Sequence, residues 1–214
     1  MSRSKRFRGF VLSLLVLLLC FAPQASAVET WYIPTPSDGM DTWFGSVYNK
    51  GGMPTDYRLR VGGSNDEYRG LLRFNLSGLP QVATKAEVRV YAFPDSGTPV
   101  DIIWSRVTST WQEDTATWSN QPTSTSFGVT KAPALNWSGW IKLDITEAYN
   151  SWRCGNASSL NFGLGLTPRA TNNAFTQFHS SDYMSDPALR PTLYLRVGNV
   201  AGVFSNYLTM VVVR

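Results

Sequence analysis

Cysteine and histidine are scarce in this sequence, and their scarcity excludes several kinds of site. Among 214 residues there are two cysteines and one histidine. Cys20 lies in an N-terminal apolar run, so Cys154 stands alone in the rest of the chain, and a single thiol cannot close an intramolecular disulfide. A disulfide framework is therefore excluded, as is a zinc site built on two histidines. The fold must be held by its core.

Long apolar runs are also few. One extends from Phe10 to Phe21 behind a positively charged start, and Ala25-Ser26-Ala27 follows it as a small-x-small cleavage site. At about twelve residues, this run is shorter than the roughly 20 that a spanning helix needs. We expect residues 1–27 to be a cleaved signal peptide and the protein to be secreted and extracellular. A lipid anchor at Cys20 is the alternative. No later run is long enough to predict a membrane span.

Net charge is small once the expected signal peptide is set aside. The full chain has 19 Lys and Arg against 15 Asp and Glu, a formal charge of +4. Residues 1–27 hold four of the 19 basic residues and no acidic ones, which leaves 15 of each and a formal charge of zero. A nucleic-acid-binding protein carries a net basic footprint, so we expect no nucleic-acid partner.

Alternation of apolar and polar residues predicts most of the secondary structure. In Lys85–Phe93, every second residue from Ala86 to Ala92 is apolar, and Glu87, Arg89 and Tyr91 lie between them, as in a half-buried strand. Further strands are predicted at 57–61, 68–76, 100–107, 140–143, 160–166, 174–179 and 192–197.

A helix is predicted at only one place, residues 147–152, where Asp144 or Thr146 could cap the first turn. About ten short strands and one helical turn predict an all-β fold, a jelly-roll-like antiparallel β-sandwich with one short helix. We assign residues 28–198 to this module and 199–214 to a hydrophobic tail. The tail is either an extra edge strand, which could recruit a protein partner or a second copy, or a poorly ordered end.

Residues 108–123, here called the tryptophan segment, read TSTWQEDTATWSNQPT. A buried tryptophan needs a partner for its indole N–H, and Glu113 or Asn120 could accept that bond. Thr117 and Asp114 could hold a turn. We interpret the segment as architecture, with sugar contact as the alternative. The residues assigned this structural role are Trp111, Glu113, Thr117, Trp118, Asn120, Pro122 and, further along the chain, Asp144.

Catalytic patterns are weak. Glycoside cleavage needs two carboxyl groups that flank one bond, whereas Glu113 and Asp114 are neighbours that face opposite sides of an extended chain. Either could still pair with a distant carboxylate. No Gly-x-Ser-x-Gly elbow occurs. Tyr183 follows His179 by four residues, a spacing that by itself indicates no site. We expect the protein not to be an enzyme.

Arginines occupy the polar side of three predicted strands. If these strands are neighbours, their side chains form a basic, partly aromatic platform that suits carboxylate-bearing sugars, because arginine pairs two-point with a carboxylate. The alternative is a solvated face with arginine–Glu87 pairs. The candidate carbohydrate-binding residues are Arg58, Arg60, Arg69, Arg73, Arg89, Tyr91 and, as a separate aromatic platform, Trp43.

Short motifs occur in a fixed order along the chain. They are Arg58–Gly62, Arg69–Pro80, Ala83–Tyr91, Trp111–Pro122, Asp144–Trp152, Asn161–Leu164 and Arg190–Leu193. The ordered set resembles the DNRLRE-type domain, now grouped with the family-96 carbohydrate-binding modules. The resemblance implies a β-sandwich that binds carbohydrate without catalysis. Because some members accompany alginate-degrading enzymes, it also implies an acidic polysaccharide as ligand.

We therefore expect a secreted, non-catalytic carbohydrate-binding module whose partner is a polysaccharide or cell-surface glycan. Two alternatives stay open: a structural or adhesive surface protein, and a weak polysaccharide lyase or hydrolase. No metal site is assigned and no catalytic cofactor is expected. A structural calcium ion stays open, because Asn65-Asp66-Glu67 and the stretch from Asp182 to Asp186 offer oxygens in predicted loops.

Overall fold

The structure is a computed structural model that describes residues 27–47, 51–94, 98–155, 160–170 and 172–198. Almost all of the expected signal peptide (1–27) and the whole expected hydrophobic tail (199–214) lie outside the described residues. Within those ranges, no helix is both long enough and apolar enough to cross a membrane.

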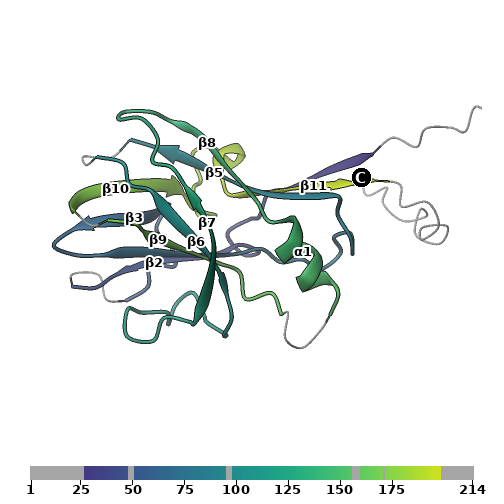
Figure 1. Cartoon of the computed structure of the whole chain (residues 1–214), viewed down its shortest axis with the longest axis horizontal. Helices are drawn as coiled ribbons and strands as arrows, with labels where there is room; N and C mark the ends of the chain where they lie inside the picture. The colour runs from purple at the N-terminus through teal and green to yellow at the C-terminus, as the bar shows by residue number, and fades with distance from the viewer. Residues whose placement is uncertain (1–26, 48–50, 95–97, 156–159, 171, 199–214) are drawn as a thin grey trace, which may run out of the picture.

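The described chain is built almost entirely of antiparallel strands (Figure 1). The strands are β1 (Val28–Tyr32), β2 (Met40–Gly45), β3 (Arg58–Ser64), β4 (Tyr68–Arg73), β5 (Lys85–Phe93), β6 (Ile102–Val107), β7 (Ser124–Thr130), β8 (Gly139–Asp144), β9 (Leu164–Pro168), β10 (Asn172–His179) and β11 (Thr192–Val197). One α-helix, α1 (Thr146–Arg153), and a 3₁₀ turn, η2 (Pro187–Leu189), complete the described elements. The predicted all-β fold with one short helix is confirmed.

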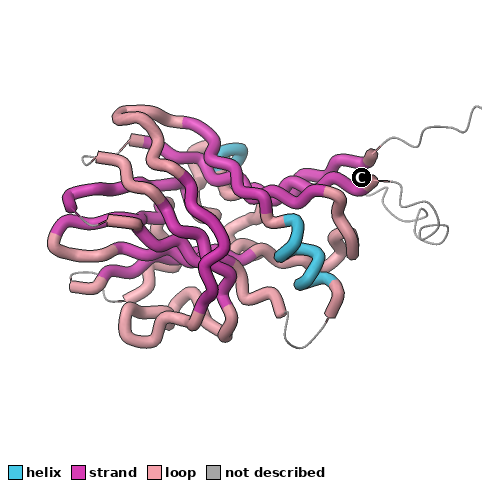
Figure 2. The backbone as a smooth tube through the Cα atoms, viewed as in Figure 1, coloured by secondary structure: helices cyan, strands magenta, loops and turns pink. Residues whose placement is uncertain are grey.

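Hydrogen bonds join the strands into one curled sheet, whose main path is β1-β11-β5-β10-β3-β4-β9-β6-β7. Two strands attach to its side, β2 on β4 and β8 on β5. The pair formed by β1 and β11 extends from one end of the body as a ribbon (Figure 2). β5 pairs with three strands, with β8 along one edge and with β11 and β10 along the other.

The main core lies on the inner side of this sheet. The apolar side chains of β5 from Ala86 to Ala92 are buried there, as their alternation predicted. Tyr149 and Trp152 of α1 pack into the same cluster, and the Tyr149 hydroxyl donates a hydrogen bond to the Pro80 carbonyl. Burying one such large apolar side chain stabilises the fold by about 1.5–3 kcal/mol.

The start of α1 differs in part from the prediction. The residue that caps the helix is Ile145, which makes no side-chain capping bond. The Asp144 carboxylate instead accepts bonds from the Thr146 amide at 2.9 Å and from its hydroxyl at 2.6 Å. The capping prediction is confirmed for Asp144, which accepts the first amide of the helix, but not for Thr146. The Thr146 hydroxyl lies against β5, where it accepts a bond from the Ala86 amide at 3.0 Å. Asp144 and Thr146 therefore attach the helix to the sheet.

A second, smaller core cluster forms where the tryptophan segment covers β2 and β4. Its buried members are Phe44, Leu71, Val107, Trp111 and Ala116. The segment thus supplies the apolar cover that β2 and β4 need on this side. This cover positions Glu113, because the Asp41 amide of β2 donates to its carboxylate at 2.8 Å.

Candidate functional site

The predicted arginine platform is divided in the structure. β10 lies between β5 and β3, and β3 meets β4 through a single residue pair, Gly62 with Tyr68. The condition that the three strands be direct neighbours is therefore not met. Arg58, Arg89 and Tyr91 nevertheless lie on adjoining strands beside β10, whereas the other candidates have different surroundings.

A line of aromatic side chains crosses the sheet at β8, β5 and β10. Trp140 pairs in register with Tyr91, and their rings meet edge to face at 5.3 Å. His179 follows Phe178, the partner of Ala92, so it lies beside Tyr91 and stacks on that ring at 5.7 Å. We call Trp140, Tyr91, His179, Tyr183 and Tyr57 the aromatic row.

The row continues past β10 into the next loop. Tyr183 stacks on His179 with ring centroids 3.6 Å apart, and Tyr57 lies 6.3 Å from Tyr183. Tyr57 is 47% exposed, whereas His179 is 7% exposed. The row therefore has accessible rings around a nearly enclosed histidine.

His179 is held by aromatic rings rather than presented for chemistry. Phe93 stacks on it at 4.3 Å, in addition to Tyr91 and Tyr183. Its Nδ1 has no hydrogen-bond partner among the described residues. Burial lowers the pKa of the imidazole, opposed by the charge of Asp186. This environment favours the neutral ring.

Cationic side chains flank the aromatic row. Arg58 pairs in register with His179, lies over the Tyr57 ring at 4.8 Å and bonds Asp56 at 3.0 Å. On the other flank, Arg89 pairs in register with Lys142 of β8. Lys142 is exposed, and no described residue forms an ion pair with it.

Arg89 is held more firmly than Lys142. It bonds Glu87 at 2.6 Å, and its guanidinium lies 4.2 Å from the ring centre of Trp31 and 4.9 Å from that of Tyr194. Trp31 is 50% exposed. Arg89 therefore lies between the aromatic row and the exposed indole of Trp31.

Trp43 is buried, and Arg60 is half-buried beside it. Trp43 is 2% exposed and donates its indole N–H to Asp56 at 3.1 Å, so it presents no ring face to a ligand. Arg60 lies 5.5 Å from the ring centres of both Trp43 and Tyr68. We leave both residues out of the candidate surface.

Arg69 and Arg73 contact the tryptophan segment. Arg69 lies 4.5 Å from the ring centre of Trp118 and bonds Gln121 at 2.6 Å. Arg73 lies 5.7 Å from the ring centre of Trp111 and bonds the Met40 sulfur. Their contacts hold the segment on β4, and no ring contact joins either arginine to the aromatic row.

The hydrogen bonds that hold the tryptophan segment differ from those predicted. The Trp111 indole donates to the Phe162 carbonyl at 2.7 Å, rather than to Glu113 or Asn120, because Phe162 packs against the same cluster. Asn120 accepts from the Thr117 amide at 2.6 Å and donates to the Thr115 carbonyl at 2.9 Å. The turn is thus held by Asn120 and Thr117. Pro122 follows, half-buried.

Glu113 meets two distant carboxylates. Asp41, Glu113 and Asp182 each place a carboxylate oxygen within 4.8 Å of the other two. Burial raises the pKa of Asp41 to about 7 and that of Glu113 to about 7, and it also raises the pKa of Asp182.

Of the two loop stretches considered for calcium, one contributes Asp182 to this cluster. Asp186 instead accepts a bond from the Ala188 amide, and Asp66 bonds Ser46 and Val47.

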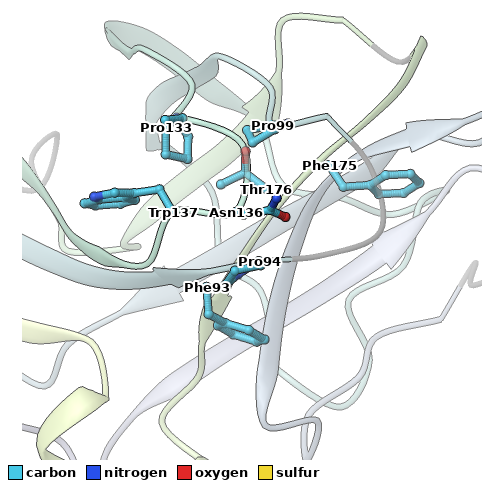
Figure 3. A pocket seen from close by; sticks show the side chains of 9 residues that line it. Phe93, Pro94, Pro99, Pro133, Asn136, Trp137, Phe175 and Thr176 are labelled. Carbon is cyan, nitrogen blue, oxygen red and sulfur yellow. The ribbon is translucent and has the colours of Figure 1, made fainter.

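Two hollows in the described part of the chain differ in size. One is bounded by Pro94, Pro99 and Thr176, and Figure 3 shows the rings of Trp137 and Phe175 directed to opposite sides of it. Its free volume is about 10 Å³, roughly the space of one water molecule. A second, more open hollow of about 240 Å³ is lined by residues of the tryptophan segment, among them Thr110, Trp111 and Asn120. No residue of the aromatic row lines either hollow, so a ligand on the row would lie on an open face.

Comparison with known families decides the kind of protein. The model of carbohydrate-binding module family 96 matches residues 39–194. The chain belongs to this family. Its members are non-catalytic carbohydrate-binding modules, as the resemblance implied. No curated protein matches the chain. The match covers β2 through the start of β11, and so includes the whole aromatic row of this family-96 module.

Sequence reasoning did not assign Trp140, Lys142, Tyr57 or Tyr183 to a binding surface. The alternation of Lys85–Phe93 was a usable signal, since it placed Arg89 and Tyr91 outward. What was missing was the register of β8 against β5, which sets Lys142 beside Arg89 and Trp140 beside Tyr91.

Proposed function

We propose that this family-96 module is a secreted, non-catalytic protein that binds an acidic polysaccharide on the aromatic row and its flanking cations. The observation that supports this proposal most directly is the alignment of Trp140, Tyr91 and His179 across adjoining strands, with Arg58 at one end and Lys142 beside Arg89 at the other.

Aromatic rings suit the apolar faces of sugar rings. Three strand spacings from β8 to β3 measure about 14 Å, which is enough for a short oligosaccharide rather than one ring. The exposed parts of Trp140, Tyr91 and Tyr57 provide stacking surface, and each Tyr or Trp also carries a polar atom that can bond a sugar hydroxyl. An open face accepts an internal segment of a polymer, as this proposal requires.

The cations that flank the aromatic row favour an acidic ligand. Each sugar of a uronate polymer carries a carboxylate, and charge-assisted bonds to arginine or lysine are stronger than neutral ones. Glu87 and Asp56 already hold Arg89 and Arg58. Lys142 is exposed and without an ion pair among the described residues, so we assign it the first carboxylate contact. Arg89 then provides the second, through the guanidinium nitrogens that Glu87 does not use.

Binding of the purified protein to immobilised uronate polymers and to neutral polysaccharides tests the proposal. We expect retention on the acidic polymers that weakens as salt is raised, because exposed charges are screened. Equal retention on neutral and acidic polysaccharides would exclude a preference for acidic ligands, but it would agree with stacking of sugars on the aromatic row. Absence of retention on every polysaccharide would favour the adhesive alternative, in which the same fold contacts a protein.

A further inference from the structure

We propose that Asp41, Glu113 and Asp182 bind one calcium ion, which ties the tryptophan segment to the sheet. This inference is independent of the proposed glycan surface, since none of the three residues belongs to the aromatic row. It concerns a metal site that the family assignment does not supply.

The geometry of the three carboxylates fits calcium. Calcium–oxygen distances of about 2.3–2.6 Å allow two ligand oxygens on opposite sides of the ion to lie up to about 5 Å apart. The oxygens of Asp41, Glu113 and Asp182 lie within 4.8 Å of one another. Oxygen-only ligands are those that calcium prefers.

Asp41 provides an independent sign of a missing partner. Its side chain is 1% exposed, and its Oδ1 has no hydrogen-bond partner among the described residues. The other oxygen, Oδ2, accepts a bond from the Ser181 amide at 2.7 Å. Buried polar atoms are rarely left unsatisfied, so the Oδ1 atom of Asp41 indicates a ligand within the cluster.

Protein side chains compensate the charge of the cluster only at a distance. In the described part of the chain, no lysine or arginine forms an ion pair with any of the three carboxylates. Buried neighbouring carboxyl groups must hold either a proton or a cation. The charge of Arg73 lowers the pKa of Glu113, and the charge of Arg190 lowers the pKa of Asp182. Arg73 itself bonds the Met40 sulfur, and Arg190 donates to the Tyr183 carbonyl.

The position of the cluster gives the ion a structural task. Asp41 lies on β2, Glu113 in the tryptophan segment, and Asp182 in the loop between β10 and η2. Glu113 and Asp182 are only half-buried, so solvent can supply the remaining ligands that calcium needs. A bound ion would therefore fasten three segments that are remote in sequence.

Calcium titration of the chelator-treated protein tests the site. We expect CaCl₂ to raise the unfolding temperature progressively with concentration, because ligand that binds only the folded state stabilises it by mass action. The same titration by calorimetry should show a single calcium ion per chain. Identical unfolding temperatures in EDTA and CaCl₂, with no heat of binding, would overturn the proposal and leave protons as the partners of the carboxylates.

Two variants and a control locate the ion. Glu113→Gln and Asp182→Asn should each reduce the calcium-induced rise in unfolding temperature at least several-fold. Asp114→Asn, which changes an exposed neighbour outside the cluster, should retain the rise. If either cluster variant does not fold, terbium luminescence of the unmodified protein tests the site in its place. Emission sensitised by a nearby tryptophan such as Trp111 and displaced by CaCl₂ supports the site, and its absence overturns it. An equal response to MgCl₂ would overturn the choice of calcium.

Discussion

The Asp41 carboxylate accepts a 2.7 Å hydrogen bond from the amide of Ser181, a residue 140 positions away in the sequence. The Asp41 amide in turn donates to Glu113, 72 positions away, at 2.8 Å. One buried residue of β2 thus connects the tryptophan segment to the loop that follows β10. That loop also contains Tyr183, which stacks on His179 of the aromatic row.

Substitution of Asp41 should therefore destabilise the fold even in chelator. Asp41→Ala removes the acceptor of a buried amide, and leaving such a donor unsatisfied costs about 1–3 kcal/mol. Asp41→Asn keeps an oxygen at the same place and should lose less. Urea unfolding of both variants in EDTA measures the difference. Equal losses would show that the Ser181 bond does not stabilise this junction.

The two tryptophans of the tryptophan segment should differ in their effect on stability. Trp111 is 5% exposed and bonded to Phe162, so Trp111→Ala should cost about 3–5 kcal/mol. Trp118 is half-buried and contacts Arg69 and Phe44 at its edge, so Trp118→Ala should cost about 1–2 kcal/mol. Denaturant unfolding gives both values. Folded variants that lose glycan binding would show instead that these rings contact sugar.

Two substitutions on the proposed glycan face should weaken binding while the protein stays folded. Trp140→Ala removes stacking surface and should reduce affinity about ten-fold, a loss of about 1.4 kcal/mol. Lys142→Ala removes an exposed charge and should reduce affinity about five-fold, mostly at low salt.

The matched control for these variants is Lys131→Ala. Lys131 is also an exposed lysine, but it bonds Asp101 at 2.9 Å and lies outside the aromatic row. Calorimetry with a soluble oligouronate compares the three proteins. A loss with Lys131→Ala as large as that with Lys142→Ala would mean that overall charge, rather than this face, controls binding.

His179 should make stability depend on pH below neutrality. Burial lowers its pKa in the folded state, so the unfolded chain binds a proton first as the pH falls. The stability that the neutral ring contributes is present above the unfolded pKa of about 6.5 and is lost as the pH falls through the folded pKa. Because the chain has one histidine, the ring signals in an NMR titration report its pKa directly.

The control for this prediction is His179→Phe, which keeps an aromatic ring and removes the titration. Asp41 and Glu113 titrate in the same pH range with the opposite sign, because their raised pKa values make the folded state the better proton binder. The difference between the stability profiles of the two proteins isolates His179. An NMR pKa at or above 6.5 would contradict the enclosed position of the ring.

The sequence predicted those strands that have one buried face. β5 alternates cleanly because its apolar side chains enter the core and the others face outward. β2 was missed because five of its six residues are buried, which removes the alternation. β1 and β7 were missed because they form the two ends of the sheet path and are largely exposed, so neither shows an apolar face.

The candidate site depended on contacts that local patterns do not encode. Alternation placed Arg89 and Tyr91 outward, but their neighbours Lys142 and Trp140 follow from strand register. Glu113 was noticed for its neighbour Asp114, whereas the structure joins it to Asp41 and Asp182. Trp43 was considered an exposed ring because Trp43-Phe44-Gly45 cannot all face one core. In the structure, Phe44 enters the smaller core cluster, whereas Trp43 is buried beside Tyr68 and Arg60 and bonds Asp56.

The most direct test of the glycan face is an NMR titration of the isotope-labelled protein with a short oligouronate. We expect the indole N–H of Trp140 and the ring signals of His179 to shift with the same affinity, while the indole N–H signal of the buried Trp111 does not shift. Shifts at Trp111 without shifts at Trp140 would place the binding site on the tryptophan segment and contradict the proposed glycan face.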